Sequence, residues 1–271
     1  MVWFGFDMAR NNVPSKLGTK KVASSSGKNV WVISLGGSRI VPDDVDDKFL
    51  LEFRKLIDSH GDKKFVVVCG GGRTARRYMG ALKKLGKSNK GQSMEGIAVT
   101  RLHAEFMARF FGKKANEEIP MDMKRVENLL KKNRVVFCGA LRWRDKNTSD
   151  GTAAKIAGRL KSPFINLTNV RGLYDRDPSA PKGVPRAQVA SAKADKLGKE
   201  KAKFISKISW RGFLRVARKV KFEAGQHFVL DKVAAEEILK KQIVTYIVGS
   251  LKSMDGVLRN NKKINGTVIS G

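Results

Sequence analysis

Three short apolar runs in this chain each end directly in glycine, and each is followed by a segment with helical periodicity. The runs cover residues 30–35, 64–69 and 135–138. Apolar or small residues recur at helical spacing over residues 47–59, 74–85, 96–111, 123–132 and 149–160. Strands that alternate with helices in this way are typical of a parallel sheet covered by helices on both faces. We therefore predict a three-layer α/β sandwich with a mainly parallel central sheet.

The same pattern continues in the C-terminal half. A short apolar run at residues 164–167 predicts another buried strand. Further strands are predicted at residues 228–230, 244–248 and 267–269, and helices at residues 210–220 and 232–239. We expect one folded domain over residues 29–271.

Two segments differ from this domain in composition. Residues 1–28 contain the loop signal Ser24-Ser25-Ser26-Gly27 and predict a weakly ordered basic extension. Residues 179–203 are rich in Lys, Ala and Pro and poor in large apolar side chains. That composition predicts an exposed insertion or linker.

The charge of the chain limits its partners. Its 55 Lys and Arg against 25 Asp and Glu give a net charge of +30, which attracts nucleotides and polyanions alike. No zinc spacing, RNP motif or interleaving of basic and aromatic residues is visible. We favour a solvated basic surface, and non-specific nucleic-acid binding stays an alternative.

The sequence also indicates a compartment. No run of about 18 apolar residues is present, so no membrane span is expected. The N-terminus lacks the pattern of a secretory signal. Cys69 and Cys138 each lie in an apolar run before glycine, as small core residues do. We expect a cytoplasmic protein without disulfides.

Two glycine-rich segments follow strands and suit phosphate binding. Gly36-Gly37-Ser38 offers backbone N–H groups and a hydroxyl to an anion, although such turns are common. Gly70-Gly71-Gly72 precedes a predicted helix with Arg76 in its first turn, where a guanidinium can bind phosphoryl oxygens in a bidentate manner. The alternative is a tight turn with surface arginines.

A third segment contains Thr148-Ser149-Asp150 at the start of a predicted helix. Thr148 or Ser149 is a plausible N-cap, and the same hydroxyl and N–H groups suit a phosphate. Capping alone would explain these residues. Their functional interpretation rests on their combination with the glycine segments.

A fourth segment, residues 168–178, follows the strand predicted at 164–167. It begins with Thr168-Asn169 and is interrupted by Gly172 and Pro178, so its polar side chains lie at the carboxyl edge of the sheet. Open α/β sheets bind ligands at that edge. Asn169, Tyr174 and Asp177 supply a polar rim and an aromatic wall suited to a nucleotide.

The order of these motifs resembles the amino-acid kinase superfamily, and within it most of all the uridylate kinases of archaeal type. The ordered motifs are Gly-Gly-Ser at 36–38, Gly-Gly-Gly-x-x-Ala-Arg at 70–76, Thr-Arg-x-x-Ala at 100–104, Thr-Ser-Asp at 148–150, Thr-Asn-Val-x-Gly-x-Tyr-x-x-Asp-Pro at 168–178 and Gly-Thr-x-Ile at 266–269. Archaeal-type members lack the lysine that many relatives have before the first glycines, and Ser34-Leu35 stands there in this chain. The resemblance covers the chain from the first strand to the last, apart from the insertion.

The resemblance implies a reaction in pyrimidine nucleotide synthesis. ATP and UMP would give ADP and UDP with Mg²⁺, in a homo-oligomer, commonly a hexamer built from dimers. Residues 29–165 would form the acceptor-binding part and residues 166–271 the ATP-binding part. The acceptor is a phosphate oxygen that is already ionised at neutral pH, so the reaction needs alignment and charge stabilisation rather than a general base.

The resemblance also assigns residues by motif. ATP would contact Gly37, Ser38, Gly72, Arg76, Thr168, Asn169, Tyr174 and Asp177. UMP would contact Gly71, Ser93, Thr148, Ser149 and Asp150. Arg76, Ser38 and Asp150 would form the catalytic set, and no side chain is expected to bind a metal.

This chain departs from the family pattern at several positions. Arg171 stands where many relatives have Asp, and it would pair with phosphate or point to solvent. Ser93 takes the place of the ribose-binding acidic residue by simple spacing, with Glu95 as a shifted candidate. The loop at residues 141–147 is longer than usual and carries Arg142, Trp143, Arg144 and Lys146.

Three further interpretations remain. His103, where many relatives have Asn, suits a packing or interface role better than proton transfer. Another phosphotransferase of the same fold, acting on a small carboxylate or an isoprenoid phosphate, is one functional alternative. An inactive polyanion-binding protein on this scaffold is the other, motivated by the charge and by Arg171.

Overall fold

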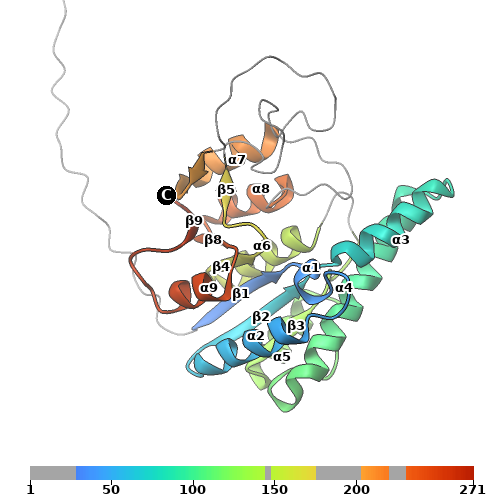
Figure 1. Cartoon of the computed structure of the whole chain (residues 1–271), viewed down its shortest axis with the longest axis horizontal. Helices are drawn as coiled ribbons and strands as arrows, with labels where there is room; N and C mark the ends of the chain where they lie inside the picture. The colour runs from blue at the N-terminus through green and yellow to red at the C-terminus, as the bar shows by residue number, and fades with distance from the viewer. Residues whose placement is uncertain (1–28, 144–147, 175–202, 220–229) are drawn as a thin grey trace, which may run out of the picture.

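The computed structural model describes residues 29–143, 148–174, 203–219 and 230–271 (Figure 1). The extension expected at residues 1–28 lies outside these ranges, as do Asp177, Arg144, Lys146 and all of the insertion at 179–203 except its last residue. Within the described ranges, no helix is long and apolar enough to cross a membrane.

A seven-stranded sheet in the order β3-β2-β1-β4-β8-β9-β7 forms the centre of the molecule (Figure 1). Its strands are β1 (Val30–Leu35), β2 (Lys64–Cys69), β3 (Val135–Cys138), β4 (Phe164–Leu167), β7 (Lys207–Ser209), β8 (Thr245–Val248) and β9 (Gly266–Ser270). Every neighbouring pair is parallel except β8 and β9. The predicted mainly parallel sheet is confirmed.

Helices cover both faces of this sheet. They are α1 (Gly37–Ile40), α2 (Asp47–Ser59), α3 (Gly72–Lys84), α4 (Asn89–Phe111), α5 (Met123–Lys132), α6 (Ser149–Leu160), α7 (Trp210–Lys219), α8 (Lys232–Lys241) and α9 (Leu251–Leu258), with a short 3-10 helix at Gly112–Lys114. The side chains of β2 alternate between two cores: Val66 and Val68 pack with α5 to α8, whereas Phe65 and Val67 pack with α2, α4 and α9. The three-layer sandwich is therefore confirmed.

Seven of the described elements have the predicted bounds. They are the strands β1, β2, β3 and β4 and the helices α2, α5 and α6. The strands are apolar runs ended by a polar residue or glycine. Each of the three helices begins after a side chain that accepts a hydrogen bond from a backbone N–H of its first turn. Local signals therefore define where these elements begin and end.

Other predictions need correction. Helix α4 begins at Asn89 rather than at residue 96, because Ser88 caps it through a bond from Gly91 N to Ser88 Oγ of 3.2 Å. The turn expected after β1 is the short helix α1. The strand predicted at 228–230 lies mostly outside the described residues, and Leu230 is in no strand. The pattern missed β7, α9 and a small antiparallel sheet of β5 (Leu173–Tyr174) and β6 (Phe204–Ile205).

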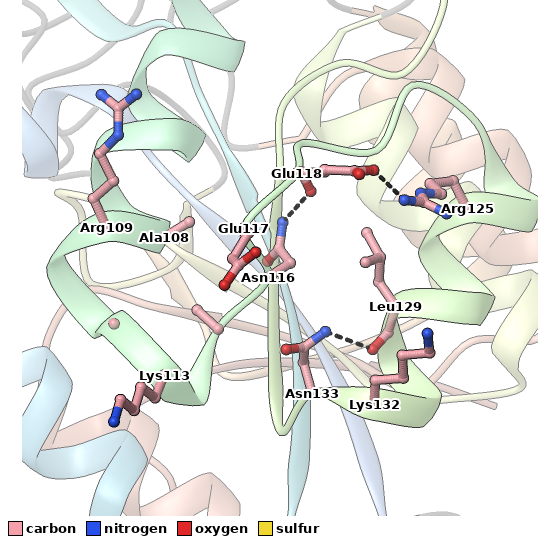
Figure 2. Close-up of a pocket in the computed structure, with 12 residues that line it drawn as sticks. Ala108, Arg109, Lys113, Asn116, Glu117, Glu118, Arg125, Leu129, Lys132 and Asn133 are labelled. Atoms are coloured by element: carbon pink, nitrogen blue, oxygen red, sulfur yellow. Dashed lines mark hydrogen bonds and ion pairs between the residues drawn. The ribbon is translucent and has the colours of Figure 1, made fainter.

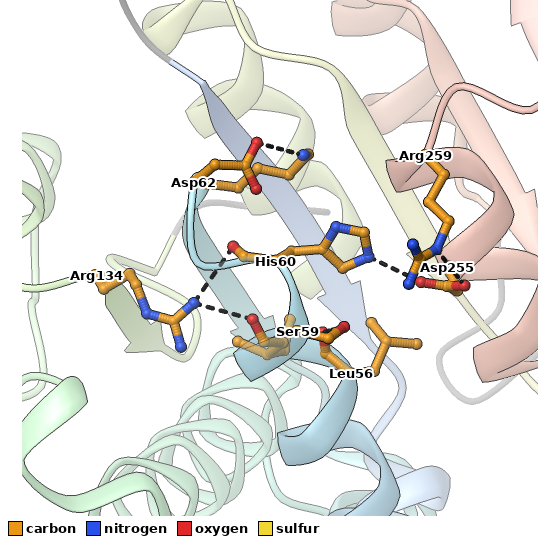
Figure 3. A network of polar contacts seen from close by, with 9 residues as sticks. Leu56, Ser59, His60, Asp62, Arg134, Asp255 and Arg259 are labelled. Carbon is orange, nitrogen blue, oxygen red and sulfur yellow. Dashed lines mark hydrogen bonds and ion pairs between the residues drawn. The ribbon is translucent and has the colours of Figure 1, made fainter.

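A polar network closes the amino-terminal side of β2 and β3 (Figure 3). His60 Nε2 lies 2.8 Å from Asp255 Oδ1, and Arg259 Nε donates to Asp255 Oδ2 over 2.8 Å. The bond from Arg259 holds the pKa of the Asp255 carboxyl below its usual range. Arg134 donates to Asp58 Oδ1 over 2.6 Å and so ties the start of β3 to α2. These contacts occupy one end of the sheet and leave the carboxyl end for a ligand.

Candidate active site

The glycine loops after β1 and β2 are in direct contact. A Cβ atom on Gly37 would lie 2.3 Å from Gly70 O and 2.4 Å from Gly72 N. Gly72 has a φ of 57°, which favours glycine, and a Cβ there would lie 2.4 Å from the carbonyl carbon of Gly37. No side chain fits between the loops. The backbones that were predicted separately to bind phosphate therefore form one surface.

Arg76 lies beside Ser38 at this surface. Its Nη2 donates to Ser38 Oγ over 3.4 Å, a long hydrogen bond between partly buried side chains. Burial lowers the pKa of the Arg76 guanidinium, and the charge of Arg73 lowers it further. Within the described residues Arg76 makes no other hydrogen bond or ion pair. Its remaining donors are free to bind an anion.

The start of α6 brings a carboxyl group to the end of β1. Thr148 caps the helix, since Gly151 N donates to Thr148 Oγ1 over 3.1 Å. Asp150 lies in the first turn, and its Oδ1 accepts from Ser34 Oγ over 2.6 Å. Ser34 is on β1, two residues before Gly36. The Thr-Ser-Asp segment and the first glycine loop thus belong to the same site.

Asp231 completes this cluster and was not predicted from the sequence. It caps α8, because its Oδ1 accepts from Ala234 N over 2.8 Å, and its Oδ2 accepts from the hydroxyl of Thr148. Burial raises the pKa of Asp231. Burial and the charge of Asp231 raise the pKa of Asp150 to about 7, against the opposing effect of the Ser34 bond. Near neutral pH Asp150 is therefore partly protonated, which weakens its repulsion of an incoming phosphate.

Arg39, on α1, is a second residue that the sequence did not single out. Its Nε donates to Thr168 O over 3.3 Å, and its Nη2 donates to Gly249 O. Its guanidinium lies over the ring of Phe49, 5.1 Å from the centroid, and burial lowers its pKa. Arg39 holds the carboxyl ends of β4 and β8 together. Its position directly after Gly-Gly-Ser was the available signal.

Thr168 and Asn169 lie where β4 ends, as predicted. Thr168 N donates to Val248 O over 3.0 Å, and Thr168 Oγ1 donates to Asn169 Oδ1 over 3.3 Å. Leu167, directly before them, pairs with Leu35 of β1. Two of the residues assigned to ATP therefore lie beside the first glycine loop.

Arg171 is exposed at the surface, as one of its two expected arrangements has it. Its Nε donates to Asn265 Oδ1 over 2.7 Å, and its guanidinium lies 4.1 Å from the centroid of the Phe204 ring. Tyr174 packs on the same ring, with centroids 5.5 Å apart and ring planes at 63°. Arg171 therefore links the β5–β6 pair to the segment before β9. The predicted aromatic wall at Tyr174 is part of this stacked group.

The expected acceptor side is formed by the second glycine loop and α4. A Cβ on Gly71 would lie 3.5 Å from Gly96 O, so the loop lies directly against the helix. His103 is buried, its Nδ1 donates to Gly70 O over 2.8 Å, and burial lowers the pKa of its ring. This is the packing role that was favoured for it. Ser93 and Ser149 are partly exposed, one turn before Gly96 and at the first position of α6 respectively.

Two cavities of similar volume, about 730 and 740 Å³, are lined by other residues than those of the site. The first lies between the C-terminal end of α4 and α5 (Figure 2). Arg125 pairs with Glu118 there, and Asn133 donates to Leu129 O over 2.9 Å. Asn133 precedes β3, so the cavity is near the amino end of that strand, away from the glycine loops.

The described residues contain no group of three or more His, Cys, Asp or Glu side chains that could hold a metal ion. Magnesium usually keeps several waters and takes further ligands from substrate phosphates. A magnesium ion of this kind needs no cage of protein side chains.

Comparison with known proteins defines the class. The amino acid kinase family matches residues 29–219, and the chain belongs to this family. The uridylate kinases of Methanopyrus kandleri and Archaeoglobus fulgidus are each 32% identical to it, over 246 and 242 residues. These alignments cover 89% and 88% of this chain and 99% of each relative.

Solved structures agree. The crystal structure of the Archaeoglobus fulgidus uridylate kinase aligns with a TM-score of 0.69 at 30% identity, over 89% of this chain and 99% of that one. The UMP kinase of Bacillus anthracis aligns with a TM-score of 0.66 over 89% and 96% of the two chains, and at 16% identity it supports the fold alone. The resemblance to archaeal uridylate kinases that the motif order indicated is confirmed.

Proposed function

We propose that this protein is a UMP kinase that transfers the γ-phosphoryl group of ATP to UMP and produces ADP and UDP. One observation carries the proposal. The two glycine loops, Arg76 with Ser38, and the start of α6 with Asp150 meet at the carboxyl edge of one sheet, in a chain similar to archaeal uridylate kinases over nearly its whole folded length.

The chemistry follows from these groups. The acceptor phosphate is already ionised, so no side chain has to remove a proton. Backbone N–H groups of Gly37, Ser38 and Gly72 and the guanidinium of Arg76 stabilise the charge on the transferring phosphoryl group. The positive end of α6 attracts the acceptor phosphate to Thr148 and Ser149.

Asp150 has a positioning role in this arrangement. The Ser34 bond fixes its carboxyl group, and its partial protonation near pH 7 allows an anionic acceptor to approach. With one proton, the carboxyl group can also donate a hydrogen bond to a phosphate oxygen. The residues expected to act together are therefore Arg76, Ser38 and Asp150.

The nucleoside groups occupy opposite sides of the glycine loops. ATP extends from Gly72 toward Thr168, Asn169 and Tyr174, within the part formed by residues 166–271. UMP extends from Gly71 toward Ser93, within the part formed by residues 29–165. Magnesium bound to the ATP phosphates would neutralise charge during transfer. We assign no protein side chain to that ion.

A homo-oligomer, a hexamer by resemblance, is also part of the proposal. Exposed apolar side chains on the projecting α3–α4 pair, Tyr78 and Leu102 among them, support subunit contact there (Figure 1). A charge of +30 per subunit opposes assembly at low salt.

The proposed activity is that of a cytoplasmic enzyme of pyrimidine nucleotide synthesis. The similar proteins are uridylate kinases, which favours this activity over the two functional alternatives.

A coupled assay of ADP release tests the function. With Mg²⁺ and ATP, UMP is expected to give the highest rate in a panel that also contains CMP, AMP and no acceptor. A rate that does not depend on UMP would overturn the proposal. A higher rate with another acceptor would show that the protein is a phosphotransferase that acts on that acceptor instead of UMP.

A further inference from the structure

Three arginines share one face of α7. Arg211, Arg215 and Arg218 follow one another at spacings of four and three residues, which places their side chains on the same side of a helix. All three are exposed. They extend over about 10 Å of helix, at ~1.5 Å per residue. Residues 203–219 contain no Asp or Glu, so this surface, the α7 arginine face, has no acidic residue of its own segment beside it.

The arginines of this face differ from the exposed arginines on other described elements. Most of the others lie within 3.8 Å of a carboxylate oxygen, as do Arg73, Arg77, Arg109, Arg125, Arg142, Arg159 and Arg259. Arg171 donates to Asn265 instead. In the part of the chain that the structure describes, the side chains of the three α7 arginines form no hydrogen bond or ion pair. Their guanidinium donors are free to bind an anion from outside the protein.

The neighbouring helix α8 does not supply the missing negative charge. Helix α7 packs on α8, which carries Glu236 and Glu237. Glu236 Oε1 lies 3.8 Å from Lys232 Nζ on the same helix, and Glu237 faces α6, where its Oε1 would lie 3.2 Å from a Cβ on Gly158. Lys207 of β7, three residues before α7, is exposed and adds a further positive charge. The positive surface therefore extends beyond the helix itself.

The opposite face of α7 is buried. Phe213, Leu214 and Ala217 belong to the core, and the indole of Trp210 is partly buried and donates to Ile243 O over 2.9 Å. A helix that lies on a lipid bilayer needs a free apolar face, and stacking on bases needs an exposed aromatic ring. Helix α7 offers neither, because its large apolar side chains pack in the core.

The α7 arginine face is also separate from the glycine loops. Strand β7 is at the edge of the sheet, and α7 follows it directly at the periphery of the molecule (Figure 1). Strand β7 is parallel to β9, which is antiparallel to β8, whereas β8, β4 and β1 are parallel to one another. Strand β7 therefore runs opposite to β1, and α7 begins at the end of the sheet away from the glycine loops.

We propose that the α7 arginine face binds the phosphate backbone of nucleic acid. This inference goes beyond the proposed function and does not depend on it. Guanidinium groups bind phosphate oxygens in a bidentate manner, and a row of them along a helix fits a chain of phosphodiesters better than a single small anion. Contacts to the backbone carry no sequence information, so the binding is independent of sequence and weakens steeply with salt.

Fluorescence anisotropy of the full chain with a labelled DNA duplex of arbitrary sequence, measured over a series of salt concentrations, tests this surface. One variant combines Arg211→Gln, Arg215→Gln and Arg218→Gln, because Gln keeps the helix propensity and removes the charge. Each phosphate contact contributes about 0.9 to the slope of log K against log salt for a duplex. The variant should therefore lower that slope by ~2–3 and raise the Kd about 10-fold or more at moderate salt.

The matched control combines Lys83→Gln, Lys84→Gln and Lys87→Gln. These lysines are exposed at the C-terminal end of α3 and just after it, and their loss removes the same charge from the chain. The basic residues outside the described ranges are the same in both variants. The control should keep nearly the Kd and the slope of the wild type, and both variants should keep its circular dichroism.

Equal losses of duplex affinity in the two variants would show that net charge attracts the duplex without a particular surface, and would overturn the inference. An unchanged affinity in the α7 variant would overturn it too. Cosedimentation with vesicles of phosphatidylserine and phosphatidylcholine separates a membrane role. Vesicle binding that is lost in the α7 variant while duplex binding persists would assign the surface to anionic lipid instead. These results are independent of UMP phosphorylation, which the ADP-release assay tests separately.

Discussion

Ser34 Oγ donates to Asp150 Oδ1 over 2.6 Å and so joins the first strand of the sheet to the first turn of α6. Ser34 is only 2% exposed, and Asp150 has a second carboxyl group, that of Asp231, as its neighbour. No cation of the described residues forms an ion pair with Asp150 within 4 Å. The carboxyl group is therefore held by a neutral donor, and it retains its proton to an unusually high pH.

Asp150→Asn is expected to change how stability depends on pH. The folded pKa of Asp150 is about 7 and its ordinary value is 3.8, so between these values the folded protein holds a proton that the unfolded chain releases. The free energy of unfolding contributed by this group therefore falls as pH rises from about 4 to about 7. The Asn variant should gain stability relative to the wild type over this range.

Urea unfolding at pH 4.5, 6 and 8 would measure the effect. Asp44→Asn, which removes an exposed carboxylate, is the control. Parallel pH profiles for the wild type and Asp150→Asn would contradict the raised pKa of Asp150.

Arg76→Ala is expected to lower kcat/KM for UMP phosphorylation by about 100-fold or more, the usual cost of losing one donor to a transition-state charge. Its thermal midpoint should change little, because the side chain makes only one long hydrogen bond in the described part of the protein. Arg77→Ala removes the next, exposed arginine and should leave the rate nearly unchanged. Equal losses of rate and stability in Arg76→Ala would show a structural role instead.

Gly37→Ala is expected to separate the two glycine loops. The added methyl group would lie 2.3 Å from Gly70 O, and overpacking of this kind commonly costs about 1–3 kcal/mol. Activity should be lost with it. Gly80→Ala is the matched control, because a Cβ there has no neighbour within 4 Å and alanine favours the interior of α3 by about 0.5–1 kcal/mol. A Gly37→Ala enzyme with wild-type rate and stability would show that the close contact of the two glycine loops is not required for either.

Arg171→Asp introduces the carboxylate that the family resemblance implies at this position, yet it is not expected to raise activity. The change removes the stack on Phe204 and the bond to Asn265, which together order the β5–β6 pair beside Tyr174. We expect a weaker KM for ATP and a lower thermal midpoint, with the KM for UMP unchanged. Asn265→Ala should reproduce part of this loss. Higher activity in Arg171→Asp would mean that the native arginine impairs the site.

Much of the fold could be predicted because its signals are local. The runs of β1, β2 and β3 are apolar and end at glycine. The helices α2, α5 and α6 each follow a capping residue that marks where the helix begins. The first turns of α4 are polar and lack that pattern. Ser88 caps them, and Gly96, directly after them, lies against Met79 of α3.

The site could be predicted only in part for the same reason. The glycine loops and the arginine that follows the second loop are visible in the sequence, whereas Asp231 joins the site through Thr148, which is 83 residues away. Arg39 contacts Thr168 from a distance of 129 residues. The order of the strands in the sheet brings such partners together, and no short segment of the sequence contains both residues of either pair.

The most direct test of the proposed activity is phosphorus NMR of the protein with Mg²⁺, ATP and UMP. The signals of UDP and ADP should appear together in equal amounts as those of ATP and UMP decline, and Arg76→Ala should slow both by about 100-fold. Release of inorganic phosphate with unchanged UMP, or no change in any signal at all, would contradict phosphoryl transfer to UMP by this site.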